Sequence, residues 1–178
     1  MKQISLESWV MELRRNLEDV WCPETRYHGT VVVPSDHLSK GQCGASSLVL
    51  AKALVNHGYD AYFCEGDAIF PPEKGKNVSI NNHCWVMIKN YYRNNGSFSD
   101  AIIDLTADQE GHSEKVLFRS KNELKKLHID YNESASGGHK KPNQVYAKHV
   151  LERADILQDG LNKKRANNIS NGSIIMTL

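Results

Sequence analysis

A cysteine, whose thiol can act as a nucleophile, lies where a helix is predicted to begin. Cys43 lies between Gln42 and Gly44, at the start of a segment rich in small and aliphatic residues. Apolar positions over residues 44–57 follow a helical period, and Gly58 stands where the helix would stop. A thiol at a helix N-terminus lies near the positive end of the helix dipole, which lowers its pKa. Cys43 is therefore the candidate nucleophile, and the first N–H groups of the helix could stabilise an oxyanion.

A nucleophilic thiol needs an imidazole that exchanges a proton with it and a carboxylate that holds the imidazole in one tautomer. His83 precedes a predicted strand over residues 84–88, and Asp104 lies near the end of a second over residues 101–105. Residues 94–97 between them include an Asn-Gly step, which favours a tight hairpin turn. Strands joined by a hairpin are antiparallel neighbours, so His83 and Asp104 should lie at the same end of the pair. The spacing predicts an Asp-to-His hydrogen bond.

Five residues beside these three are candidates for binding an oxyanion or a substrate: Gln42, Gly44, Trp85, Asp108 and Gln109. The Gln42 amide could donate to an oxyanion, and Gly44 lets a substrate backbone approach closely. Trp85 should share a strand face with the histidine, where it either walls the site or belongs to the core. The last two follow the second strand closely enough to line a cleft. Asp108 is the alternative to Asp104 as the orienting carboxylate, and the strand register favours Asp104.

The remaining segments predict an α+β fold. An amphipathic pattern predicts a helix over residues 5–21. Further helices are expected over 120–127 and 142–158, strands over 30–33 and 60–66, a loop over 71–77, and a docked strand at 174–176. We expect one catalytic domain over residues 1–160, in which the helix carrying the cysteine packs against an antiparallel sheet carrying the histidine and the aspartate. A mobile C-terminal tail is expected over residues 161–178.

Charge and composition argue against some classes of partner. The chain has 22 Lys and Arg against 21 Asp and Glu, a formal charge of +1, so no global field favours nucleic acid or an anionic membrane. No apolar stretch approaches the roughly 20 residues that span a bilayer. The charged N-terminal segment has the wrong composition for a secretory signal peptide, so we expect a cytoplasmic protein, while secretion as an effector stays open. The oligomeric state is open as well.

The four cysteines, Cys22, Cys43, Cys64 and Cys84, predict free thiols in a reducing compartment rather than a disulfide framework. A zinc site is the alternative reading, but zinc ligands usually come in pairs two to four residues apart. The one close pair, His83 and Cys84, is adjacent in sequence, and its side chains should point to opposite faces of a strand. We therefore expect neither a metal nor a cofactor.

The order of these elements resembles the core of transglutaminase-like cysteine enzymes, which are similar to papain-like enzymes. The resemblance lies in the small-residue Cys43 helix start, the Gly-Tyr-Asp-Ala step into a strand, His83-Cys84-Trp85-Val86, and Asp104-Leu105-Thr106, and it covers residues 40–110. It implies a triad of Cys43, His83 and Asp104. The chain departs from the family in having Gln42, rather than an aromatic residue, beside the nucleophile. In papain-like enzymes a glutamine donates to the oxyanion.

The resemblance implies acyl chemistry on an amide through a thioester. If water resolves the thioester, the protein is a cysteine protease, an amidase or a glutamine deamidase. If an amine does, it is a transglutaminase or another acyltransferase. The small size of the chain favours hydrolysis of a protein or peptide substrate. A non-catalytic binding module on the same fold and a zinc-dependent protein are the rival hypotheses.

Overall fold

The structure, a computed structural model, describes residues 5–27, 38–73, 75–92, 98–135 and 138–170. The helices are α1 (Leu6–Glu18), α2 (Cys43–Asn56), α3 (Lys121–Lys126) and α4 (Lys148–Ser170), with short 3-10 helices η1 (Pro23–Thr25), η2 (Ala107–Glu110) and η3 (Pro142–Gln144). The strands are β1 (Ala61–Glu73), β2 (Lys76–Tyr92), β3 (Phe98–Asp104), β4 (Leu117–Ser120), β5 (Asp130–Glu133) and β6 (His139–Lys140).

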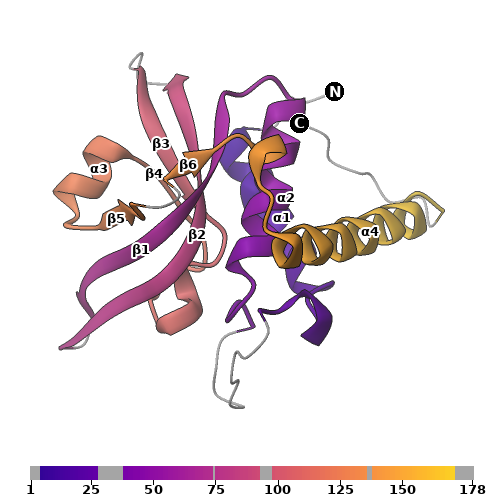
Figure 1. The fold of residues 1–178 in the computed structure, drawn as a ribbon, viewed down its shortest axis with the longest axis horizontal. Helices are drawn as coiled ribbons and strands as arrows, with labels where there is room; N and C mark the ends of the chain where they lie inside the picture. The colour runs from indigo at the N-terminus through magenta and orange to yellow at the C-terminus, as the bar shows by residue number, and fades with distance from the viewer. Residues whose placement is uncertain (1–4, 28–37, 74, 93–97, 136–137, 171–178) are drawn as a thin grey trace.

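All six strands belong to one open antiparallel sheet. Its order is β4-β3-β2-β1-β5, and β6 pairs with β1 beyond β5 along the same strand. Helices α1 and α2 cover one face of the sheet, α4 packs on them from outside, and α3 lies on the opposite face (Figure 1). The protein is therefore an α+β fold in which the central strands β2 and β3 are covered on both faces.

Each face of the sheet has its own apolar core. The first lies under the helices, and α2 is buried on nearly all sides within it because almost every residue from Gly44 to Ala51 is apolar or small. The second is closed by α3 and β5, which contribute Leu124 and Tyr131, and by Ile129 between them. The amphipathic helix α1 adds Val10 and Leu17 to the first core, and its N-cap Ser5 accepts a hydrogen bond from the backbone of Ser8. Burial against both layers holds β2 and β3 in place.

A β-bulge in β2 sets the direction of His83. Next to the pair Gly66–His83, β2 carries one more residue than β1. The extra residue, Asn82, has a φ of 52°, and its N–H donates to Asp67 Oδ1 at 3.0 Å. Asparagine tolerates this left-handed conformation better than most residues. The bulge shifts the alternation of β2 by one position, so Trp85, and with it His83 two residues away, lies on the face that Val78 and Ile80 occupy before the bulge.

The structure confirms the expected α+β class and the main elements. The helices expected over 5–21 and 44–57 are present as α1 and α2, and β2 and β3 are antiparallel neighbours. The loop expected over 71–77 is wrong in extent, because β1 continues to Glu73 and β2 starts at Lys76. The expected strands at 30–33 and 174–176 and the turn at 94–97 lie outside the described residues.

The C-terminal region differs from the expected boundary at residue 161. Helix α4 continues to Ser170. Two contacts anchor its second half to the end of α1: Gly160 packs close to Val20, and Lys164 forms an ion pair with Asp19. Residues 171–178 lie outside the described part.

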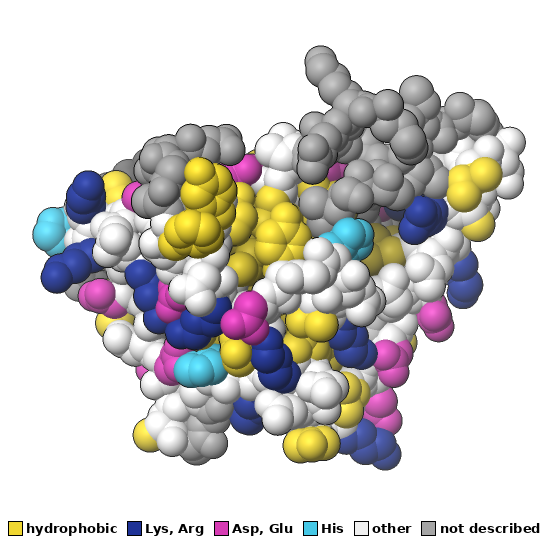
Figure 2. Space-filling model, turned by 90° about the horizontal axis from the view of Figure 1, so that it is seen from above, with side chains coloured by type: hydrophobic (Ala, Val, Ile, Leu, Met, Phe, Trp, Pro, Cys, Tyr) yellow, Lys and Arg dark blue, Asp and Glu magenta, His cyan; other side chains and the backbone are white. Residues whose placement is uncertain are grey.

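The charged side chains are of both signs on the face seen in Figure 2, where Lys and Arg are interspersed with Asp and Glu. Within the described residues, no helix is long and apolar enough to cross a membrane.

Candidate active site

Cys43 is the first residue of α2, and its half-buried side chain borders a cavity of about 520 Å³. The preceding Gly41 has a φ of 76°, a left-handed conformation that turns the chain into the helix. The N-cap residue, Gln42, makes no capping hydrogen bond with its side chain. The thiol therefore lies at the positive end of a buried 14-residue helix whose first turn is not capped by that side chain.

His83 and Asp104 form a fully buried pair on β2 and β3. The distance from His83 Nε2 to Asp104 Oδ2 is 2.6 Å. The carboxylate also accepts hydrogen bonds from the Thr106 N–H at 2.8 Å, from the Thr106 hydroxyl at 3.2 Å and from the Tyr131 hydroxyl at 2.8 Å. Burial alone would raise the pKa of Asp104, but the His83 charge and these hydrogen bonds lower it. Asp104 is thus held as a carboxylate with all its partners in place.

The Asp104 charge acts on His83 in turn. Burial alone would lower the pKa of His83, but the Asp104 carboxylate and Cys43 outweigh it and raise that pKa to about 10. Burial also raises the pKa of Tyr131, with the Asp104 charge acting in the same direction, so the Tyr131 hydroxyl stays protonated as a donor. The Asp104 and Cys43 interactions thus favour protonation of His83, whose Nε2 proton faces Asp104, while the Gln109 donor at Nδ1 opposes it.

Gln109 joins the other nitrogen of His83 to the loop before α2. Its Oε1 accepts from the Gly41 N–H at 2.9 Å, and its Nε2 lies 2.9 Å from His83 Nδ1. A backbone N–H can only donate, so the Gly41 contact fixes the orientation of the amide and turns its NH₂ group toward Nδ1. In this arrangement Nδ1 accepts a hydrogen bond. Protonation of Nδ1 therefore requires the Gln109 amide to turn or move away.

The Cys43 thiol interacts with two neighbours, Cys84 and His83. The hydrogen bond from Cys84 lowers the pKa of Cys43 most, burial opposes it, and the hydrogen bond and charge of His83 lower it further, to well below the ordinary value. The Cys43 interaction and burial raise the pKa of Cys84. Of the two thiols, Cys43 is therefore the one that ionises, while Cys84 remains a donor to it.

The predicted accessory residues divide into two groups. Gly44 and Gln109 border the cavity beside Cys43. Gln42 points away, with its Nε2 donating to the Cys22 carbonyl at 3.3 Å. Trp85 is completely buried in the second core against Tyr131.

Asp108 is turned away from the cavity as well. It forms a buried ion pair with Arg14 at 3.0 Å, which leaves Asp104 as the partner of His83.

Sequence reasoning missed three members of the site. Tyr131 comes from the four-residue strand β5, which is too short for a periodic pattern. Arg153 borders the cavity from α4, far away in sequence. Cys84 belongs to the first core, and only the packing of α2 on β2 brings it to Cys43. The Asn81-Asn82 pair was the one local signal for the bulge beside His83.

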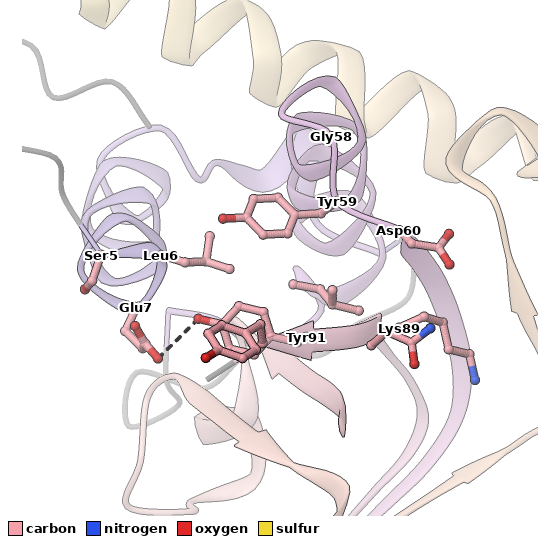
Figure 3. A pocket seen from close by; sticks show the side chains of 11 residues that line it. Ser5, Leu6, Glu7, Gly58, Tyr59, Asp60, Lys89 and Tyr91 are labelled. Atoms are coloured by element: carbon pink, nitrogen blue, oxygen red, sulfur yellow. Dashed lines mark hydrogen bonds between the residues drawn. The ribbon is translucent and has the colours of Figure 1, made fainter. Parts of the chain in front are cut away.

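A larger cavity of about 740 Å³ lies at the opposite end of α2, near Gly58 (Figure 3). Its wall includes Tyr59 and Tyr91, and the Tyr91 hydroxyl donates to Glu7 at 3.5 Å. No cysteine or histidine lines it among the described residues. It does not include Cys43, His83 or Asp104 and is not part of the site.

Within the described ranges, no group of three His, Cys, Asp or Glu side chains is placed to hold a metal ion. No family model, curated protein or solved structure matches the chain. The candidate active site is therefore defined by its own geometry.

Proposed function

We propose that the chain is a cysteine-nucleophile enzyme that attacks an amide carbonyl and forms a thioester on Cys43. One observation carries the proposal. The Cys43 thiol, at the start of the buried helix α2, interacts with the His83 imidazole, and Nε2 of that imidazole lies 2.6 Å from the buried Asp104 carboxylate. This is the relation of nucleophile, base and orienting group that acyl transfer requires.

The roles follow from the atoms that face one another. Nε2 of His83 is bound to Asp104, so Nδ1 exchanges the proton with Cys43. The Cys43 thiolate attacks the acyl carbon, and the C–S bond forms as the carbonyl oxygen becomes an oxyanion. The first N–H groups of α2 stabilise that oxyanion. His83 Nδ1 then donates its proton to the leaving amine as the C–N bond breaks.

Gln109 acts as a positioning residue in this scheme. It holds the neutral imidazole through Nδ1 and the Gly41 loop through its oxygen. Once Nδ1 takes the proton, two donors face each other and the contact becomes unfavourable. The Gln109 amide must therefore leave Nδ1 in each cycle, which also clears space beside the thiol.

We further propose that water resolves the thioester, which makes the protein a hydrolase of protein or peptide amides. The helix that carries Cys43 and the antiparallel strands that carry His83 and Asp104 support a transglutaminase-like or papain-like core as the finer description of the fold. Transfer to an amine uses the same three residues and is the second candidate.

An acylation burst tests the proposal. With p-nitrophenyl acetate, the wild type should release one equivalent of nitrophenol rapidly and acetylate Cys43, and Cys43→Ala should show no burst. Cys22→Ala is the matched control and should behave as wild type. An equal burst in Cys43→Ala would refute the proposal. An added primary amine then separates the two outcomes, since only a transferase forms the amide faster than water releases acetate.

A further inference from the structure

Two arginines of the described residues are buried, and they differ sharply in their partners. Arg14 is 3% exposed and forms ion pairs with Asp108 at 3.0 Å and Glu18 at 2.9 Å, besides donating to two backbone carbonyls. Arg153 is 4% exposed, yet no carboxylate of the described residues pairs with it. Burying a cation without a counter-ion is costly. A buried cation without a carboxylate partner is therefore a candidate for binding an anionic ligand.

The guanidinium of Arg153 lies at the wall of the cavity that Cys43 borders. Its Nε donates to the His149 carbonyl at 2.6 Å within α4, and its Cζ lies 5.4 Å from the centre of the Tyr27 ring. Nη2 is 3.9 Å from the position that a Cβ on Gly44 would take. One nitrogen is therefore anchored, and Nη2 lies beside the first turn of α2, where the guanidinium interacts electrostatically with Cys43.

The two carboxylates at the cavity wall are already paired, and the charge of the Cys43 thiolate is balanced by protonated His83. Glu65 pairs with Lys140 at 3.3 Å, and Glu110 pairs with Lys40 at 3.7 Å. Burial lowers the pKa of Arg153, and the nearby Cys43 opposes that effect, but arginine remains charged at any physiological pH. The charge that is left unbalanced at the wall is thus a positive one with the fork geometry that suits a carboxylate.

We propose that Arg153 forms an anion subsite of this cavity and that the preferred acyl donor carries a carboxylate beside the acyl carbon that Cys43 attacks. The inference rests on the proposed function, because it assigns the substrate class of the same site. Two sources of the carboxylate share this chemistry: an acidic side chain and a free C-terminus.

Paired alkylating agents probe the subsite without a known substrate. Iodoacetate and iodoacetamide react with the same thiol and differ in one carboxylate. The rate of Cys43 alkylation by iodoacetate is divided by the rate with iodoacetamide, both measured by peptide mass spectrometry. This ratio should fall about tenfold in Arg153→Met, the scale of a lost charge-assisted contact. Arg153→Lys keeps the charge and should retain part of the preference. Arg165→Met, an exposed arginine on the same helix, is the matched control and should leave the ratio unchanged.

The outcomes are separable. An unchanged ratio in Arg153→Met would overturn the subsite. An equal slowing of both reagents would overturn it too, since Arg153 would then act on the thiolate instead of on a carboxylate. The iodoacetamide rate of the wild type reports the reactivity on which the proposed function depends.

A second measurement needs no reactive thiol. Succinate titrated into the wild type should give a saturable shift of the Arg153 Nε–H signal in ¹⁵N spectra. An unreactive Cys43 together with this shift would contradict the proposed function and support the subsite. No saturable shift would overturn the subsite. Two pairs of peptide substrates distinguish the two sources of the carboxylate. A preference for a Glu peptide over its Gln counterpart indicates an acidic side chain, and a preference for a free over an amidated C-terminus indicates a C-terminal carboxylate.

Discussion

The charge on His83 can be measured through the pH dependence of folding in a Cys43→Ser variant. In that variant the coupled thiol no longer titrates, while Asp104 still faces the imidazole. The pKa of His83 in the folded chain is raised to about 10, against burial and chiefly by Asp104. Histidine in an unfolded chain has a pKa of about 6.5. A pKa that is higher in the folded state adds stability that is complete below the unfolded value and is lost as the pH rises toward the folded value.

The size of the effect follows from this difference. Cys43→Ser removes the smaller contribution of the thiol to the raised pKa of His83 and leaves the larger one of Asp104, so folded His83 should stay mostly protonated between pH 7 and 8.5 while unfolded His83 has mostly lost its proton. The free energy of unfolding should therefore fall by up to about 1.4 kcal/mol per pH unit, or at most about 2 kcal/mol over the window. The window ends at about pH 8.5, near the ordinary pKa of a thiol, because Cys64 and Cys84 then begin to act in the same direction.

Urea denaturation of three proteins at several pH values is the assay. In Cys43→Ser the free energy of unfolding should fall as the pH rises, and in the double variant that also carries Asp104→Asn this pH dependence should be absent. Added Asp108→Asn is the matched control. That carboxylate is equally buried but pairs with Arg14, so its loss should lower stability and leave the slope unchanged. A flat curve for Cys43→Ser would refute the reasoning and show that the Gln109 donor keeps His83 neutral.

Three further predictions concern the neighbours of the site. Cys84→Ala removes the thiol that donates to Cys43 and should move the pH midpoint of Cys43 alkylation upward; an unchanged midpoint would exclude that hydrogen bond. Tyr131→Phe removes one donor to Asp104 and should lower the free energy of unfolding by about 1 kcal/mol at pH 7, which urea denaturation would detect. Gly66→Ala would place a Cβ 1.9 Å from the Asn132 carbonyl oxygen, so the loss of stability should be about 1–3 kcal/mol, and a neutral effect would argue against the β1–β5 pairing.

The sequence was informative where a pattern repeats over several turns or residues. The apolar period of α2 located the helix, and with it the position of Cys43 at its N-terminus. The runs that became β2 and β3 were long enough to be recognised as strands. Their hairpin relation was sufficient to predict that His83 and Asp104 approach one another, and the structure places them 2.6 Å apart.

What could not be predicted depends on contacts between distant segments. Strands β5 and β6 have four and two residues, and they are strands only because β1 offers them a partner edge. Tyr131 and Arg153 reach the site through such packing. Residues close in sequence can also diverge, since Asp108 and Gln109 are adjacent, yet one binds Arg14 and the other His83. A tight 3-10 turn separates their directions.

The rate of Cys43 alkylation by iodoacetamide, followed by peptide mass spectrometry from pH 5 to 9, tests the central claim most directly. Cys22, which is also half-buried, serves as the internal control. The account predicts that Cys43 reacts much faster than Cys22 and near its maximal rate at pH 7. In His83→Gln the rise should move toward the ordinary thiol pKa of about 8.5. A wild-type Cys43 that reacts only near that pH, and equally in His83→Gln, would contradict it.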